Sequence, residues 1–289
     1  MTSQPDNKPS PRPPNLHAET VAGFGDEWAA FDQEGMPAAE TQRQFDIYFD
    51  VFPWAALPAN AEGFDLGCGS GRWALLVAAR VGRLHCIDAS ETALGVARRR
   101  LGEATNVSFH HASVDAIPLA DASQDFGYSL GVLHHIPDTA AGLADCVRKL
   151  KPGAPFLVYL YYRFDNRPAW FRALWQASDL VRRVVSSLPF VARRPIADVI
   201  ALTVYWPLSR GAGVAERLGV SVAHWPLASY RNRAFYSLRT DSLDRFATKL
   251  EHRFTRAEIV AMMAAAGLEG VRFNEAESFW TAVAFRRAG

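Results

Sequence analysis

The sequence predicts an α/β fold, in which a doubly wound and mostly parallel seven-stranded sheet carries a helical insertion after its fifth strand. Between residues 60 and 162, short apolar runs alternate with helical patterns, which is typical of repeated βα units. A helical pattern at residues 256–267 precedes two more strand-like runs, which would complete the sheet and add one antiparallel edge. About ninety residues separate the fifth strand from that helix, too many for a simple connection.

Local signals place the elements in order. Five strands are expected before the insertion, at residues 63–66, 84–87, 107–111, 126–130 and 156–161. Ser90 and Asp138 each place a short oxygen-bearing side chain before a helical pattern, and we expect them to cap those helices. Pro152 ends the second of these helices because proline cannot continue it. Thr255 is expected to cap the helix after the insertion and not to act in catalysis.

Two helical patterns lie outside this alternation. In residues 39–52 the aromatic side chains at helical spacing are Phe45, Tyr48, Phe49 and Phe52. This helix either packs on the sheet or closes over a ligand. In the insertion the apolar stripe at helical spacing is Phe171, Leu174, Val181, Val184, Val185 and Leu188, and the residues off it are Arg172, Asp179 and Arg183. We therefore expect the insertion to form a helical cap.

Composition excludes several classes of protein. The chain has 289 residues, of which 49% are hydrophobic and 21% charged, which argues against wholesale disorder or a fibrous chain. Its 31 basic and 30 acidic residues give a net charge of +1, so no global field attracts nucleic acid. Three cysteines without CxxC spacing argue against a disulfide scaffold and favour a reducing compartment, the cytoplasm.

The chain shows no segment that would hold it in a membrane. No stretch approaches the roughly 20 apolar residues that span a bilayer, so no integral membrane segment is expected. The first seventeen residues contain five prolines and no apolar run, which argues against a targeting sequence. We expect residues 1–18 to form a disordered tail.

A glycine-rich turn is the most informative segment, GFDLGCGSGRW at residues 63–73. Gly67, Gly69 and Gly71 lack a Cβ, so the chain can turn tightly and bring free N–H groups near a ligand at the start of a helix. The spacing differs from the GxGxxG pattern of dinucleotide sites. Asp88 follows at the end of the second strand, where a carboxylate can hold both ribose hydroxyls or merely cap the next helix. These residues favour a nucleotide-like ligand.

Further segments complete a family pattern. Asp115 lies just past the third strand, where it can accept a hydrogen bond from an exocyclic amine or bond its own loop. The segments FDLGCGSG, HCIDAS, VDAIPL, GVLHHIPD and LKPGAPFLV follow one another within residues 62–162. Together they resemble the class I S-adenosylmethionine-dependent methyltransferases, and the C-terminal part resembles the end of that fold. Residues 24–31 and 244–255 resemble a bacterial subgroup to which we attach no substrate.

The resemblance implies a Rossmann-like methyltransferase fold with S-adenosylmethionine as cofactor, and it assigns binding roles to residues at the ends of strands. The positions implied for the methionine part are Asp65, Gly67, Cys68, Gly69, Gly71, Leu130 and Gly131. The positions implied for the adenosine part are Asp88, Ala89, Asp115 and Ala116. Asp88 would bind the ribose, Asp115 the adenine amine, and the Ala116 N–H a ring nitrogen.

Methyl transfer is an in-line displacement, in which the protein mainly aligns the acceptor and excludes water. A hydroxyl acceptor also needs a base. His134 and His135 follow the fourth strand and are the candidate bases. The alternative is that both shape the loop by bonding to the backbone. Tyr161 and Tyr162 end the fifth strand and either touch the acceptor or form its rim. No cluster has metal-ligand spacing, so we predict no metal.

The expected organisation is a tail (1–18), an N-terminal helical cap (19–60), a cofactor-binding core (61–162), a helical insertion that caps the acceptor (163–252) and a C-terminal completion of the sheet (253–289). The insertion carries Trp170, Trp175, Trp206 and Trp225. Its aromatic character favours a bulky, partly apolar small molecule, or a lipid-linked or glycan-linked one, over nucleic acid. Its paired arginines either hold an anionic acceptor, rest on a membrane or are solvated: Arg182, Arg183, Arg193 and Arg194.

We therefore predict an S-adenosylmethionine-dependent methyltransferase with a small-molecule acceptor. Two alternatives stay open: an NAD(P)-dependent oxidoreductase on a Rossmann domain, and a non-catalytic subunit that binds the cofactor and serves a partner. The acceptor atom is open between oxygen, nitrogen and carbon, with a hydroxyl favoured. A homodimer is also left open, because the aromatic insertion offers contact area.

Overall fold

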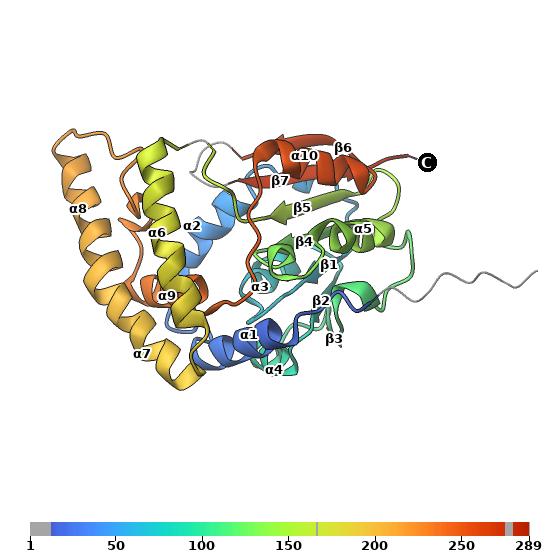
Figure 1. Ribbon diagram of the computed structural model, residues 1–289. Coiled ribbons are helices and arrows are strands. Elements are labelled where there is room, and N and C mark those ends of the chain that lie inside the picture. The colour runs from blue at the N-terminus through green and yellow to red at the C-terminus, as the bar shows by residue number, and fades with distance from the viewer. Residues whose placement is uncertain (1–12, 166, 275–279, 289) are drawn as a thin grey trace, which may run out of the picture.

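The computed structural model describes residues 13–165, 167–274 and 280–288, so most of the expected tail lies outside the described residues. Its centre is a seven-stranded sheet of order β3-β2-β1-β4-β5-β7-β6 (Figure 1). The strands are β1 (Glu62–Leu66), β2 (Arg83–Asp88), β3 (Val107–His111), β4 (Phe126–Leu130), β5 (Pro155–Tyr159), β6 (Leu268–Phe273) and β7 (Thr281–Arg286). Strands β1 to β5 run parallel and β7 runs antiparallel to both neighbours, which confirms the predicted fold class.

Helices cover both faces of this sheet. They are α2 (Ala38–Tyr48), α3 (Arg72–Ala78), α4 (Glu91–Arg100), α5 (Thr139–Lys149) and α10 (Arg256–Ala265). The predicted caps are confirmed: Ser90 Oγ accepts from the Ala93 N–H, Asp138 from Ala141, and Thr255 forms a capping box. The short oxygen-bearing side chains satisfy N–H groups that a helix start otherwise leaves without a partner.

Residues 39–52 were expected to pack on the sheet or to close over a ligand, and the structure shows the packing. Phe45, Phe49 and Phe52 are buried in the core against Trp73. Tyr48, the fourth aromatic residue of this segment, lines a cavity. Helix α2 is shorter than predicted and ends at Tyr48.

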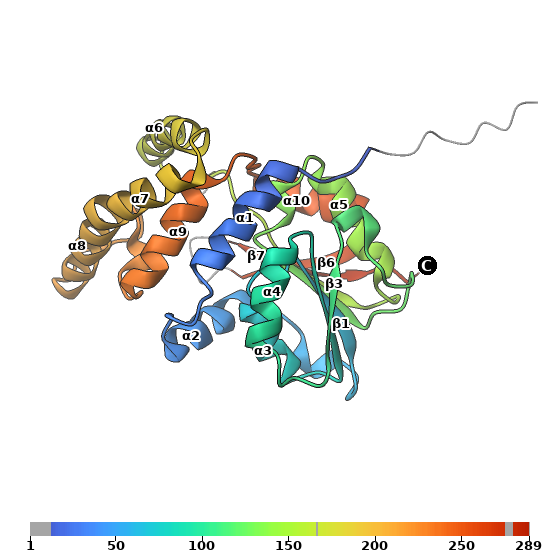
Figure 2. The same cartoon turned by 90° about the horizontal axis from the view of Figure 1, so that it is seen from below.

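The N-terminal helix α1 (Ala18–Ala30) crosses the edge of the sheet where the parallel strands end (Figure 2). It packs against α4 of the core and against α9 (Phe235–Ala247) of the insertion. Helix α1 therefore joins the two parts of the molecule along the edge where ligands of such sheets bind.

The insertion stands to one side of the sheet (Figures 1 and 2). It consists of α6 (Ala169–Ser186), α7 (Phe190–Ile200), a π-helical turn η4 (Ala201–Tyr205), α8 (Trp206–Arg217), a short η5 (Ala228–Tyr230) and α9. Helices α7 and α8 follow one another through η4 as a single rod. In Figure 1 this rod and α6 diverge from the turn that joins them, while α9 packs against α6 and α7.

The predicted apolar stripe of α6 is divided between the protein and solvent, because Val185 is buried against Tyr205 and Leu238 while other members are exposed. Leu174 and Val184 are 50% and 65% exposed, whereas Asp179, expected off the stripe, is buried together with Arg182. The reason is an ion pair between these two side chains, 2.6 Å from Nε to Oδ1, which faces α9 and takes the inner side of the helix. The helix is thus apolar on its solvent side.

Candidate active site

A cavity of about 1140 Å³ lies between the sheet edge and the insertion. On the sheet side it is lined by Leu130, Gly131 and Tyr159, which end β4 and β5. From α1 it receives Phe24, Glu27 and Trp28. The insertion supplies the rest of the wall, including Phe171, Trp175, Val204, Tyr205, Leu208 and Trp225. This volume holds a medium-sized to large organic ligand.

The glycine turn after β1 has the tight conformation that its sequence predicts. Gly67, Gly69 and Gly71 have φ values of +74°, +53° and +72°, in the left-handed region that glycine tolerates. A Cβ on Gly67 would overlap the Val132 side chain, and one on Gly69 would lie 2.8 Å from Nε1 of Trp28. Glycine is therefore required both by the backbone and by its neighbours.

The N–H groups of this turn are not free for a ligand, contrary to expectation. Those of Gly67 and Cys68 donate to the Ile87 carbonyl, at 2.7 and 3.1 Å, and that of Gly71 donates to Cys68. The bonds to Ile87 hold the turn against β2. The N–H groups left over are those of the first turn of α3, which have no intrahelical partner.

Asp65 ends β1 as a buried carboxyl group. Among the described residues its Oδ2 has no hydrogen-bond partner. Burial raises the pKa of Asp65 to about 8, because a charged carboxylate loses its hydration there. A buried acceptor without a donor is costly, and a cationic ligand would satisfy it.

Asp88 ends β2 beside the same turn. Its Oδ2 accepts from the Gly69 N–H at 2.9 Å and its Oδ1 from the Ser90 N–H at 2.8 Å. Burial raises the pKa of Asp88, although these bonds oppose the shift. Each carboxylate oxygen can accept a further bond, so the pair of oxygens fits a ribose diol.

Asp115 and Ala116 lie in a short helix after β3, where other groups already contact them. The Asn15 N–H donates to Oδ2 of Asp115 at 3.2 Å, and the Ser113 hydroxyl donates to Oδ1. The Ala116 N–H, expected to reach an adenine nitrogen, donates to the Ser113 carbonyl instead. The side chain of Asn15 also forms hydrogen bonds with the backbone of Asp138. These bonds hold the segment just before α1 beside Asp115, where the adenine is expected.

The two candidate bases His134 and His135 are buried and do not line the cavity. Nδ1 of His135 donates to the Leu250 carbonyl at 2.7 Å, and its ring lies 5.0 Å from that of Phe24. Burial lowers the pKa of His135 to about 4, which keeps the ring neutral. His134 stacks on Tyr161 at 3.8 Å between ring centroids. Their role as bases stays a prediction.

Tyr161 and Asp244 are a pair on the cavity wall that the sequence did not reveal. The Tyr161 hydroxyl donates to Oδ2 of Asp244, which projects from α9. Burial, with the charges of Asp241 and Glu251, raises the pKa of Asp244 to about 7. Tyr161 was a candidate by its place after the fifth strand, but nothing in the sequence connects it to position 244.

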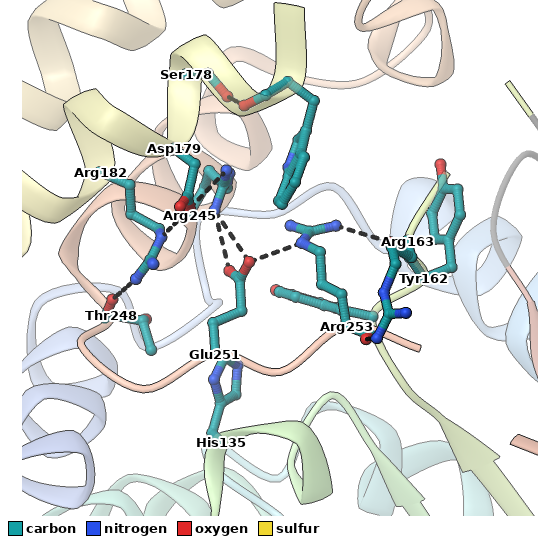
Figure 3. A network of polar contacts seen from close by, with 12 residues as sticks. His135, Tyr162, Arg163, Ser178, Asp179, Arg182, Arg245, Thr248, Glu251 and Arg253 are labelled. Carbon is teal, nitrogen blue, oxygen red and sulfur yellow. Dashed lines mark hydrogen bonds and ion pairs between the residues drawn. The ribbon is translucent and has the colours of Figure 1, made fainter. Parts of the chain in front are cut away.

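A buried ion network closes this wall (Figure 3). Glu251 accepts from Arg245 at 3.0 Å and from Arg253 at 2.7 Å, and Arg253 also donates to the Tyr162 carbonyl. Arg182, a candidate ligand for an anionic acceptor, instead donates to Asp179 and to the Thr248 carbonyl. The network joins α6, α9 and the segment after α9 to the end of β5.

Comparisons with known proteins agree with this geometry. Residues 64–158 match the family model described as "Methyltransferase domain". A ubiquinone biosynthesis O-methyltransferase of Aromatoleum aromaticum is 38% identical over 123 residues, 39% of this chain and 53% of that protein. A phosphoethanolamine N-methyltransferase of Caenorhabditis elegans is 34% identical over 100 residues, 34% of this chain and 23% of that protein.

The fold recurs in solved structures. An O-methyltransferase family protein from Burkholderia thailandensis has a TM-score of 0.52 at 14% identity, covering 92% of this chain and 59% of that one. The chain spans about half the length of the first of these curated relatives. The sheet and the glycine turn have the fold of the class I methyltransferases, and the domain match covers the part of the sheet from β1 to β5. Residues 64–158 are therefore similar to the methyltransferase domain, and a further relative, from Mycolicibacterium smegmatis, carries the name of a probable S-adenosylmethionine-dependent methyltransferase, at 33% identity over 55% of this chain and 59% of that protein.

Two features are absent from the part of the chain that the structure describes. None of the described helices is long and apolar enough to cross a membrane. Within the same residues, no group of three or more His, Cys, Asp and Glu side chains is placed to hold a metal ion.

Proposed function

We propose that this chain transfers the methyl group of S-adenosylmethionine to an acceptor that binds in the cavity beneath the insertion. One observation carries the proposal: the cavity begins at Leu130 and Gly131, the positions that the family pattern places beside the transferable methyl. Donor and acceptor would then meet at the end of β4, and an in-line displacement requires that closeness.

The residues at the sheet edge fit the cofactor. The unpartnered Oδ2 of Asp65 suits the ammonium of its methionine part, and the two oxygens of Asp88 suit its ribose. The adenine amine would take the place of the Asn15 N–H on Asp115. When bound, the cofactor supplies a methyl group on a sulfonium centre. Phe24 and Trp28 of α1 would then keep water from that centre.

The cavity wall indicates the class of acceptor. Aromatic side chains from α6, η4 and the loop after α8 surround it, including Trp175, Tyr205 and Trp225. Such walls suit a bulky, partly apolar molecule with few polar groups, whether small or attached to a lipid or glycan. Of the relatives named above, one acts through oxygen and one through nitrogen, so they leave the acceptor atom open.

Asp244 and Tyr161 favour a hydroxyl acceptor. As a carboxylate, Asp244 takes the acceptor's proton, directly or through the Tyr161 hydroxyl. The oxygen lone pair then forms the new C–O bond while the C–S bond breaks, and the proton remains on Asp244 until solvent removes it. A pKa near 7 lets this carboxyl accept a proton and release it near neutral pH. It replaces the buried histidines as our candidate for the base.

Calorimetric titration with S-adenosylmethionine, S-adenosylhomocysteine and NADH tests the proposal. We expect the first two to bind and NADH not to, with binding lost in Asp88→Ala and kept in Asp46→Ala, an exposed carboxylate on α2. Binding of NADH alone would favour the oxidoreductase. Binding without any S-adenosylhomocysteine formation on phenolic or lipid hydroxyl acceptors would favour the non-catalytic subunit.

A further inference from the structure

The outer side of α6 presents a continuous apolar stripe to solvent. Trp170, Leu174, Val181 and Val184 recur at helical spacing, and each is between 47% and 65% exposed. The inner side of the same helix holds the Asp179–Arg182 ion pair. The inner side also carries Val185, which is buried, so α6 has apolar side chains on both sides, whereas a normal surface helix turns its apolar stripe toward the core alone.

The rod formed by α7, η4 and α8 repeats this arrangement. Val191, Val199, Leu202 and Trp206 follow one another at helical spacing, and Val191 is 82% exposed. Farther along the rod, Val214 and Leu218 are also exposed. Large exposed apolar surface on a protein marks an interaction site.

Arginines flank these stripes at regular positions. Arg183 follows Leu180, Arg194 follows Val191, and Arg217 follows Val214, each three residues later and thus on a neighbouring part of the helix surface. All three arginines are exposed, and Arg183 also pairs with Asp179 at 3.0 Å, so Arg194 and Arg217 carry most of the free charge. The surface therefore combines apolar stripes with fringing positive charge.

Negative charge on the same segment is already neutralised. Residues 169–225 contain seven arginines and three acids. Asp179 pairs with Arg182, Asp198 with Arg239 at 2.8 Å, and Glu216 with Arg231 at 2.8 Å. A two-fold dimer through this surface would bring like charges together, because each copy contributes the same patch. An anionic lipid surface, by contrast, complements both the charge and the apolar stripes.

The cavity reaches this surface. Leu174 of α6, Val204 of η4, and Val220 and Trp225 beyond α8 line the cavity and are also exposed. Figure 1 shows α6 and α8 diverging from the turn that joins α6 to α7. An apolar molecule could pass between these helices without crossing water.

We propose that the outer surface of α6, α7 and α8 docks on an anionic lipid bilayer, so that the cavity between α6 and α8 takes up a lipid-soluble acceptor from the membrane. The docking rests on the surface itself, and the uptake of an acceptor rests on the proposed function. The helices lie on the bilayer with their stripes in its outer layer and their arginines at the headgroups.

Vesicle co-sedimentation of the full chain tests this, with vesicles of phosphatidylcholine alone and of equal parts phosphatidylcholine and phosphatidylglycerol. We expect binding to the anionic vesicles, weakened by salt. Val184→Glu combined with Leu202→Glu should reduce partitioning by about tenfold or more, because two inserted apolar side chains are lost. Arg194→Gln combined with Arg217→Gln should reduce it by about tenfold. Val260→Glu on α10, an exposed apolar position outside the insertion, should change little.

Each variant is also titrated with S-adenosylhomocysteine, and unchanged affinity shows that the fold is intact. Absence of binding to anionic vesicles would overturn the docking, as would light scattering that shows a dimer dissociated by the Val184→Glu, Leu202→Glu change. Vesicle binding by a chain that binds no S-adenosylmethionine would support the docking while rejecting the proposed function.

Discussion

The Tyr161 hydroxyl donates to the carboxylate of Asp244 across 83 positions of sequence, and both side chains face the cavity beside the end of β5. On its other side Tyr161 stacks on His134. The tyrosine is thus held between a buried ring and a titrating carboxyl group. The proposed acceptor would meet the protein's proton acceptor at this point.

The first prediction concerns Asp244. Its pKa of about 7 means that the fraction of ionised carboxylate rises as pH rises through 7, so the methyl-transfer rate to a hydroxyl acceptor should rise over the same interval. Asp244→Asn should lower the rate about a hundredfold and remove this rise. In Tyr161→Phe the methyl-transfer rate should still rise with pH, but by a smaller factor. Rate–pH profiles with each variant check this, and an unchanged profile in Asp244→Asn would exclude it as the base.

The second prediction concerns His135. If it is the base, His135→Ala should leave S-adenosylhomocysteine affinity nearly intact and lower turnover. Its bond to the Leu250 carbonyl also positions the segment after α9, so we expect some loss of stability as well. His135→Asn, which can donate to the same carbonyl, separates the two roles. A normal rate in either variant would remove His135 from the chemistry.

The third prediction concerns the pH dependence of stability. The pKa of Asp65 is raised from 3.8 to about 8, so the native state holds this proton more tightly than the unfolded chain does. The contribution of Asp65 to stability should therefore be greatest below pH 4 and fall as pH rises toward 8, by on the order of 1 kcal/mol per pH unit. Asp65→Asn should flatten that fall. Urea unfolding at several pH values measures it, and equal slopes in both proteins would refute the assignment.

The fourth prediction compares two ion pairs. Glu251 is 2% exposed at its side chain and pairs with both Arg245 and Arg253, so Glu251→Gln should destabilise the chain by about 3 kcal/mol, because two buried arginines lose the carboxylate that they share. Glu216→Gln breaks an exposed pair with Arg231 and should cost under about 1 kcal/mol. Chemical denaturation of both variants decides the matter. Similar losses would show that the network contributes no more than a surface pair.

Much of the core could be predicted because its signals are local. Caps such as Ser90 and Asp138 bond N–H groups three residues away, and the strands before the insertion read as short apolar runs. The glycine turn is likewise set by conformations that glycine alone tolerates readily. Caps, short strands and glycine turns each depend on a few neighbouring residues, so they can be predicted without knowledge of the rest of the fold.

Other parts of the site depend on contacts between distant segments. Asn15 reaches Asp115 only because α1 crosses the sheet edge, and no spacing in the sequence encodes that path. Part of the apolar stripe of α6 faces outward, because Asp179 and Arg182 take the inner side, where they find partners on α9 and on the segment after it. Helical periodicity identifies a stripe, but it does not say which side meets the protein.

The amino-acid sequence alone determined the α/β class, the glycine turn, the carboxylates at the ends of β1 and β2 and the cofactor class, since each follows from local conformation or from motifs in register. Only the tertiary structure decided that Asp244 faces Tyr161, that the histidines lie behind the cavity wall and that α6 exposes its apolar side. These outcomes depend on which buried charges find partners across the fold, and that is a property of long-range packing.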